Sequence, residues 1–224
     1  KGKLVKRYKR FFAEIKLDKE VVVAHCPNTG SMMGLLNEKN EVYISKNDNP
    51  KRKLKYTLEI IKVNKNLVGV NTHFANKIAY HGLSNNLIKE ISNNDNIKPE
   101  VFFDKETRFD FLVEKNKQKI FVEVKNVTLF RNENTAEFPD SITSRGSKHL
   151  KALIEAIKKG YKSYLLFLVQ IQGIESFKIA KDIDKEYYEN YLLAKKAGVI
   201  FLAYRCKIDS KEIKIEKKIK IINV

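Results

Sequence analysis

Short runs of apolar and polar residues in rough alternation fill the first third of the chain. The runs have the length of β-strands and lie at residues 10–17, 21–26, 41–46 and 55–63. Turn-forming segments separate them at Pro27–Gly30, at Asn47–Pro50 and near Asn64. Short strands punctuated by close turns are typical of a small barrel. We therefore expect a small β-barrel domain over residues 1–75.

From about residue 72 the pattern changes to helices and strands in succession. Helical periods are predicted at residues 73–83, 85–91, 144–160 and 186–198, and strands at residues 100–103, 108–113, 119–130, 164–171 and 199–206. The run at 164–171 is continuously apolar, as in a buried central strand. The tail, residues 212–224, alternates and predicts an edge strand. This order is that of a mixed α/β domain, which we place at residues 76–224.

Charged residues interrupt two of these apolar strands. Asp110 lies within RFDFLV, and Glu123 and Lys125 lie within KIFVEVKNV. If residues 114–119 form the hairpin turn between the two strands, all three side chains can meet, because neighbouring strands bring side chains to ~5 Å and diagonal ones to ~7–8 Å. Asp110 and Glu123 would then hold one divalent cation, with Lys125 beside it.

A structural ion pair across the hairpin is the alternative interpretation. The spacing acid-x-Lys recurs in this lysine-rich chain, as at Glu14, Asp209 and Glu212, where the flanks read as exposed strand faces. Glu123 differs because its flanks are apolar, and buried acids are costly unless a cation compensates them. Lys125 alone can supply that cation, so the residues leave both interpretations open.

Composition narrows the partner and the compartment. The formal net charge of +17 favours a polyanion such as nucleic acid, although 37 of the 44 basic residues are lysine and a compositional bias would also produce this. Two distant cysteines, Cys26 and Cys206, predict neither a disulfide framework nor a structural zinc site. No apolar run approaches the ~18 residues of a membrane span. We expect a soluble, cytoplasmic protein with no membrane partner.

Clustered charge gives specific candidates for nucleic-acid binding. The first ten residues carry six bases and no acid, and KRKLK follows at residues 51–55. The candidates are Arg7, Lys9, Arg10, Arg52 and Lys53, with Tyr8 available to stack on a base. Arg145, Lys148 and His149 lie at i, i+3 and i+4 near a predicted helix start, which suits either a phosphate contact or a solvated helix face.

Five blocks of the chain resemble the sugar fermentation stimulation protein (SfsA) family. They are RYKRFFAEI, HCPNTGSM, VNTHFAN, VEVKNVTL and FPDSITSRGSKHL, in this order along nearly the whole chain. The resemblance implies an OB-type barrel joined to a domain of the PD-(D/E)XK nuclease fold. It assigns Asp110, Glu123 and Lys125 to the nuclease motif, with Glu90 as a further metal ligand. It also favours a phosphate loop at Asn28, Thr29, Gly30 and Ser31, as an alternative to a simple turn.

The resemblance leads to a functional expectation. We expect the chain to be a DNA-binding protein with a nuclease-like site that holds Mg2+ or Mn2+ and hydrolyses phosphodiester bonds. The alternatives are a non-catalytic DNA-binding regulatory protein linked to sugar metabolism, since a nuclease-like fold need not cleave, and a protein that binds RNA or a small nucleotide.

Overall fold

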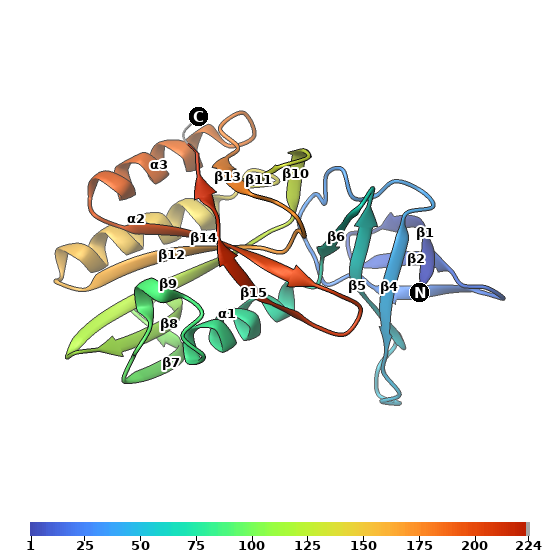
Figure 1. The fold of residues 1–224 in the computed structure, drawn as a ribbon, viewed down its shortest axis with the longest axis horizontal. Helices are drawn as coiled ribbons and strands as arrows, with labels where there is room; N and C mark the ends of the chain where they lie inside the picture. The colour runs from blue at the N-terminus through green and yellow to red at the C-terminus, as the bar shows by residue number, and fades with distance from the viewer. Residues whose placement is uncertain (223–224) are drawn as a thin grey trace.

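The N-terminal part of the chain is a closed five-stranded barrel. The computed structural model describes residues 1–222 (Figure 1). The barrel strands are β1 (Gly2–Tyr8), β2 (Phe12–Lys16), β3 (Val21–His25), β4 (Glu41–Lys46) and β5 (Tyr56–Val63). They run in the order β3-β2-β1-β4-β5, and β3 closes the barrel by pairing in parallel with β5. The OB-like barrel is thereby confirmed.

Strand β1 was missed by the sequence analysis because three of its seven residues, Lys3, Lys6 and Arg7, are basic and interrupt the apolar pattern. Leu4 is its one fully buried side chain, and the ladder to β2 carries a register shift between Leu4 and Lys6. The turn into β2 holds Lys9 and Arg10 in the left-handed region, with φ of 47° and 61°. Basic composition therefore hid a strand whose inward side chain completes the barrel core.

The second domain is built on a six-stranded mixed sheet in the order β15-β14-β12-β9-β8-β7. Its strands are β7 (Asn96–Phe102), β8 (Arg108–Lys115), β9 (Gln118–Val127), β12 (Lys162–Val169), β14 (Ile200–Ile208) and β15 (Ile213–Lys218). Strands β9, β12 and β14 are parallel, and β8 joins β9 as an antiparallel hairpin. The mixed α/β class and the hairpin at 114–119 are confirmed. The edge strand expected at 212–224 is present as β15, whereas residues 220–221 belong to another sheet and residues 223–224 lie outside the described residues.

Three α-helices cover the two faces of this sheet. Helix α1 (Ala75–Ser84) contributes Ile78, Ala79 and Leu83 to the core on one face. Helices α2 (Ser144–Lys158) and α3 (Lys185–Lys196) contribute Leu150, Leu153 and Tyr187 to the core on the other (Figure 1). Among the described residues, no helix is long and apolar enough to cross a membrane.

Two predicted elements were wrong in extent. The expected helix at 85–91 is only a short 3-10 turn, η2 (Lys89–Ile91), because Asn86 and Asn93 on either side adopt left-handed φ values of 58° and 54°. The expected strand at 119–130 ends at Val127. Beyond it, β10 (Leu129–Asn132) joins β11 (Thr135–Phe138), β13 (Ser176–Ile179) and β16 (Lys220–Ile221) in a separate four-stranded sheet.

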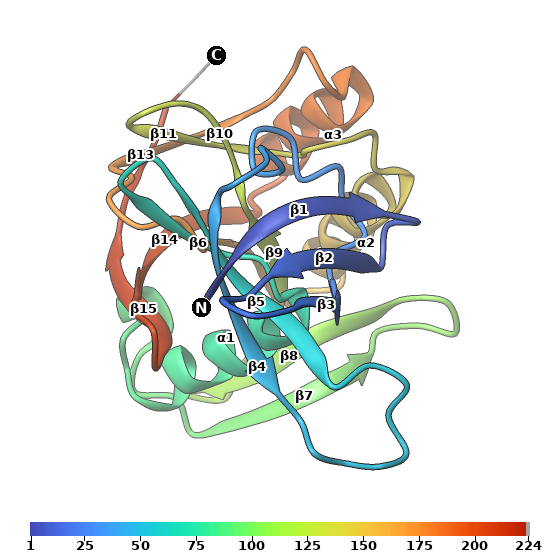
Figure 2. The same cartoon turned by 90° about the vertical axis from the view of Figure 1, so that its right-hand side faces the viewer.

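The barrel and the second domain are joined by backbone hydrogen bonds. Strand β6 (Asn66–Gly69) extends the barrel sheet beyond β5, and the 3-10 turn η1 (Thr72–Phe74) follows it before α1. The Gly69 amide donates to the Gln170 carbonyl at 2.9 Å, and the Gln172 amide donates to the Leu67 carbonyl at 2.9 Å. The segment after β12 thus pairs with β6, and Figure 2 shows the barrel in front of the sheet.

Candidate metal centre and nucleic-acid surface

Strands β8 and β9 separate at the point where Asp110 lies. Their last paired residues at this end are Phe111 and Val122. Beyond that pair the Val124 amide is bonded to a side chain instead of to the backbone of β8. It donates to Asp110 Oδ2 at 2.7 Å. Asp110 Oδ1 accepts the Asn76 side-chain amide of α1, also at 2.7 Å. The acid is therefore held in place by both the sheet and the helix.

Glu123 lies on the neighbouring strand and is almost fully buried, with 3% of its side chain exposed. Its Oε1 accepts Lys125 Nζ at 2.7 Å and contacts His149 Nδ1 of α2. Its Oε2 is buried and has no hydrogen-bond partner among the described residues. An unpaired carboxylate oxygen in this setting is costly, which makes it a candidate ligand atom.

The pKa values of Asp110 and Glu123 are shifted in opposite directions. Burial and the nearby charge of Glu123 raise the pKa of Asp110 to about 6. Burial also acts to raise the pKa of Glu123, but the positive charge of Lys125 and the hydrogen bond from His149 outweigh it and hold that pKa below its usual range. Near neutral pH both side chains are therefore carboxylates.

The donor set suits an oxygen-binding cation. Mg2+ is commonly held by one or two carboxylates and keeps several waters, so Asp110 and Glu123 are a sufficient pair of protein ligands. Within residues 1–222 no group of three His, Cys, Asp or Glu side chains forms a more complete metal cluster. The orphaned Glu123 Oε2 gives the pair a free lone pair for such an ion.

Glu90 does not join this pair in the structure. Its Oε2 accepts the Tyr204 hydroxyl at 2.7 Å, and its Oε1 accepts Lys218 Nζ at 2.6 Å. Both partners belong to β14 and β15, at the opposite edge of the sheet from β8. The assignment of Glu90 as a metal ligand rested on its position before the strands, and the short 3-10 turn directs it elsewhere.

The start of α2 supplies one buried and two exposed side chains. Arg145 and Lys148 are exposed, and Lys148 pairs with Glu106 at 2.8 Å. His149 is 8% exposed and contacts Glu123, so it belongs to the carboxylate site rather than to an open helix face. The sequence contained the signal for this, because His149 precedes the apolar Leu153 by four residues. Asn76 carried no comparable signal.

Arg7 has a structural position within the basic N-terminal cluster. Its guanidinium donates to the Asn28 carbonyl at 2.7 Å and to the Arg10 carbonyl at 3.0 Å. These bonds fix the loop after β3 against the β1–β2 turn. Lys9 and Arg10 are exposed in that turn, so unlike Arg7 they face solvent.

The remaining candidates on the barrel are also placed by the structure. Tyr8 stacks on Phe12 with ring centroids 5.4 Å apart. Arg52 donates to Thr57 Oγ1 at 3.1 Å, whereas Lys53 is exposed. Lys53 therefore remains available to a ligand, while Tyr8 and Arg52 also have packing roles.

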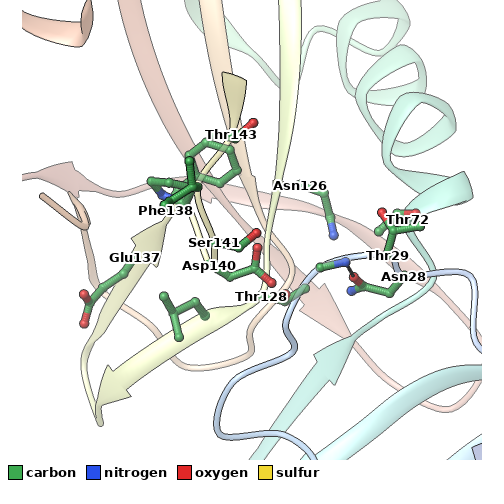
Figure 3. A pocket seen from close by; sticks show the side chains of 14 residues that line it. Asn28, Thr29, Thr72, Asn126, Thr128, Glu137, Phe138, Asp140, Ser141 and Thr143 are labelled. Carbon is green, nitrogen blue, oxygen red and sulfur yellow. Dashed lines mark hydrogen bonds between the residues drawn. The ribbon is translucent and has the colours of Figure 1, made fainter. Parts of the chain in front are cut away.

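The loop proposed for phosphate binding is docked on the second domain. The Gly30 amide donates to Asn28 Oδ1 at 2.9 Å, which forms a local turn, and the Ser31 hydroxyl donates to the Asp140 carbonyl at 2.7 Å. The Met32 amide donates to Asp140 Oδ2 at 3.2 Å. Thr29 lines a cavity beside this contact (Figure 3). Because the Gly30 and Met32 amides are engaged, they are not free for a phosphate.

Both parts of the chain match known protein families. Residues 5–70 match the family profile of the SfsA N-terminal OB domain, and residues 73–212 match that of the sugar fermentation stimulation protein RE domain. The chain belongs to the sugar fermentation stimulation protein family. A homologue from Pelagibacter ubique (strain HTCC1062) is 84% identical over all of this chain and 96% of its own length.

More distant relatives preserve the whole arrangement. A homologue from Pseudoalteromonas atlantica is 43% identical over 99% of this chain and 96% of its own length. The solved structure of Pyrococcus furiosus SfsA in complex with Ca2+ superposes with a TM-score of 0.89, over 99% of this chain and 94% of that chain, at 24% identity. The Pyrococcus furiosus protein therefore shares the fold of barrel plus mixed α/β domain.

Proposed function

We propose that this chain is a DNA-binding protein whose Asp110, Glu123 and Lys125 hydrolyse phosphodiester bonds with Mg2+ or Mn2+. The observation that carries the proposal is the meeting of two acids from neighbouring strands where those strands separate, with a lysine two residues after the second acid. This arrangement matches the PD-(D/E)XK motif that the family resemblance assigns. Ca2+ in the Pyrococcus furiosus relative further supports a divalent ion.

Each side chain has a physical role in such a reaction. A divalent ion, when bound, supplies charge neutralisation at the phosphate and lowers the pKa of a bound water. Asp110 and Glu123 would hold it, with the Val124 carbonyl as a further oxygen. Lys125 lies at the same carboxylate, where it can orient the attacking water or stabilise negative charge in the transition state. Asn76 keeps Asp110 in position.

The net charge and the cysteines of the chain bear on its partner and its compartment. The net charge of +17 and the exposed Lys9, Arg10 and Lys53 favour a polyanion, and DNA is our choice among nucleic acids. Cys26 and Cys206 are buried free thiols, as expected for a protein of the reducing cytoplasm.

Incubation with plasmid, single-stranded DNA and RNA, each with Mg2+, Mn2+ or EDTA, tests the activity. We expect metal-dependent cleavage of DNA that Lys125→Ala abolishes, while the matched variant Lys119→Ala, an exposed lysine on the same strand, keeps it. Absence of cleavage under every condition would contradict a nuclease.

Calorimetry separates metal binding from chemistry. We expect Mn2+ binding to be lost in Asp110→Ala and Glu123→Ala but retained in Lys125→Ala. Glu114→Ala is the matched control, because Glu114 is a partly exposed acid on β8 that pairs with Lys98. An unchanged isotherm in both Asp110→Ala and Glu123→Ala would refute the metal site.

One observation favours the second candidate, a non-catalytic DNA-binding regulator linked to sugar metabolism. Lys125 and His149 already compensate Glu123, so the buried acid is neutralised by protein groups alone. In that case the protein binds DNA equally well in EDTA and in Mn2+ and leaves it intact.

A further inference from the structure

A polar cavity lies between the barrel and the second domain, beside the carboxylate site. Its volume is about 250 Å3. One wall is the barrel loop at residues 28–30, and another is the segment at residues 137–143 that leads into α2 (Figure 3). Asn126, which follows Lys125 on β9, and Thr128, just past the end of that strand, line it between these walls. The cavity and the proposed metal site are therefore connected along the chain, because Asn126 directly follows Lys125 on β9.

The charges around the cavity do not suit a phosphate. No lysine or arginine is among the residues that line it within the described chain. Two acids do line it, Glu137 and Asp140, and Glu137 is paired with Arg131. Because an unshielded Asp140 repels a second anion, the occupant should be uncharged and polar. We therefore favour a neutral ligand over a phosphate at the loop Asn28–Ser31.

Unused hydrogen-bonding groups converge on the cavity. Asn126 Oδ1 accepts the Gln170 side-chain amide at 2.5 Å, which leaves Asn126 Nδ2 as a donor. Thr128 is 6% exposed, and its hydroxyl makes no hydrogen bond within residues 1–222. Asp140 uses Oδ2 for the Met32 amide and keeps Oδ1 as an acceptor. An amide donor, a hydroxyl and a carboxylate acceptor form the mixed set that reads the edge of a nucleobase.

Apolar side chains flank these polar groups. Phe138 lines the cavity and is held there by Phe167 and Tyr187, with ring centroids at 5.7 Å and 5.3 Å. Ile142, at the rim, leaves 80% of its surface exposed, which is unusual for a large aliphatic side chain. Proteins that bind unpaired bases place aromatic and aliphatic side chains against the base plane.

We propose that this cavity takes a single unpaired nucleobase and prefers one with an exocyclic amino group. The preference follows from the free Asp140 oxygen, which accepts an amino N–H and repels a carbonyl oxygen. The bound base holds its strand so that a neighbouring phosphodiester lies at Asp110, Glu123 and Lys125. The inference rests on the proposed nucleic-acid function and adds that the substrate has an unpaired base at the cut.

Fluorescence anisotropy of the full chain with three 12-residue DNA strands tests the proposal, with EDTA present so that no bond is cleaved. The strands are oligo(dC), oligo(dT) and an abasic strand with the same phosphates. We expect oligo(dC) to bind at least about tenfold more tightly than the abasic strand, as stacking of one base predicts. Oligo(dC) should also bind more tightly than oligo(dT), a base of the same size without an amino group.

Two variants link that preference to the cavity. Thr128→Val removes the hydroxyl at constant shape and should cost about threefold to tenfold in affinity for oligo(dC), the loss of one hydrogen bond. Asp140→Asn retains an acceptor for Met32 and should narrow the difference between oligo(dC) and oligo(dT). Thr128→Val should leave affinity for the abasic strand unchanged. Asp140→Asn removes a negative charge and should tighten binding of all three strands, so its effect is judged from the difference between oligo(dC) and oligo(dT) alone. Ser84→Ala, an exposed hydroxyl at the end of α1, is the control and should change nothing.

The outcomes separate this inference from the proposed function. Equal binding of oligo(dC) and the abasic strand would overturn the base site and leave nucleic-acid binding intact. Failure of all three strands to bind would overturn both. If saturation-transfer NMR shows free ribose or glucose in the cavity, lost in Thr128→Val while oligonucleotide affinities stay the same, the site is for a sugar and not a base.

Discussion

Asp110 and Glu123 show how two like residues are given different properties by their surroundings. Glu123 is compensated by Lys125 and His149, whereas Asp110 receives only neutral amide donors from Val124 and Asn76. The uncompensated acid is the one whose pKa rises, to about 6. A group with this pKa is charged at neutral pH but loses its charge under mild acid. Metal binding should therefore weaken as pH falls below about 6.

The raised pKa of Asp110 predicts a stabilising substitution. Because the folded pKa exceeds the ordinary 3.8, the native state binds more protons than the unfolded state between pH 4 and 6, so stability falls as pH rises through that window. The penalty is complete above pH 6. Asp110→Asn removes it, and the Asn76 side chain can turn its own oxygen toward the new NH2 group while the Val124 amide keeps an acceptor. The free energy of unfolding at pH 7 should therefore rise by on the order of 1–3 kcal/mol, measured by urea denaturation without metal.

The pH dependence distinguishes this effect from a change in packing. At pH 3.5 Asp110 is protonated in the native state and mostly protonated in the unfolded state, so most of the advantage of Asp110→Asn should be lost there. Glu114→Gln, in which a salt-bridged surface acid is replaced, should give no gain at either pH. A stabilisation of equal size at pH 3.5 and pH 7 would show that relief of buried charge is not the cause.

The position of Gly30 leaves no room for a side chain, because Asp140 lies against it. A Cβ atom there would lie 2.3 Å from Asp140 Oδ2, the oxygen that accepts the Met32 amide. Gly30→Ala should therefore separate the loop from the second domain and lower the free energy of unfolding by roughly 1–3 kcal/mol. In the Asp140→Ala background the same substitution should cost much less. Equal costs in both backgrounds would show that the two residues are not coupled.

At the scale of elements, the sequence predicted structure best where one period runs through many residues. Helix α2 and strand β12 were found because their apolar positions are unbroken. The helix expected at 85–91 failed because its few apolar residues are flanked by asparagines that adopt left-handed conformations. The approach of Asp110, Glu123 and Lys125 to one another was predicted because charges within apolar strands are conspicuous. Asn76 and the packing of His149 depend on tertiary contacts that no local pattern specifies.

The hairpin that brings β8 against β9 carries removable strain. Its two central residues, Asn116 and Lys117, both have left-handed φ values, 50° and 62°. Asparagine tolerates this conformation but lysine does not, and Asn-Gly is the preferred pair in such turns. Lys117→Gly should therefore raise the free energy of unfolding by about 0.5–1 kcal/mol, measured by thermal denaturation.

A second glycine variant is the control for the hairpin. Lys119→Gly, two residues on in the regular ladder opposite Glu114, should lower stability by about 0.5–1 kcal/mol because glycine has greater freedom in the unfolded chain. If Lys117→Gly is as harmful as Lys119→Gly, the turn is not strained by its lysine.

At the scale of the whole molecule, the seam between domains determines what lies near the carboxylates. The pairing of β6 with the segment after β12, and the docking of Ser31 on Asp140, place the barrel loop beside the end of β9. Neither contact has a sequence signature, because each joins residues about a hundred positions apart. The two domains could be predicted separately, but the cavity that they form could not.

The barrel's contribution to DNA binding can be measured through its dependence on salt. Each phosphate contact that is lost should flatten the slope of log K against log salt by ~0.9 for duplex DNA and ~0.7 for a single strand. Lys9→Glu with Arg10→Glu changes two exposed bases in the β1–β2 turn and should weaken binding to all sequences alike, since phosphate contacts carry no base preference. Arg7 is kept, because its bonds to the Asn28 and Arg10 carbonyls make its replacement a structural change. The matched control is Lys195→Glu with Lys196→Glu at the end of α3, far from the barrel in Figure 1, which makes the same change in net charge. Arg145→Ala and Lys148→Ala should flatten the slope as well if the start of α2 faces the bound strand.

Equal slopes for the turn variant and the α3 variant would exclude the barrel as the DNA-binding surface and confine recognition to the second domain.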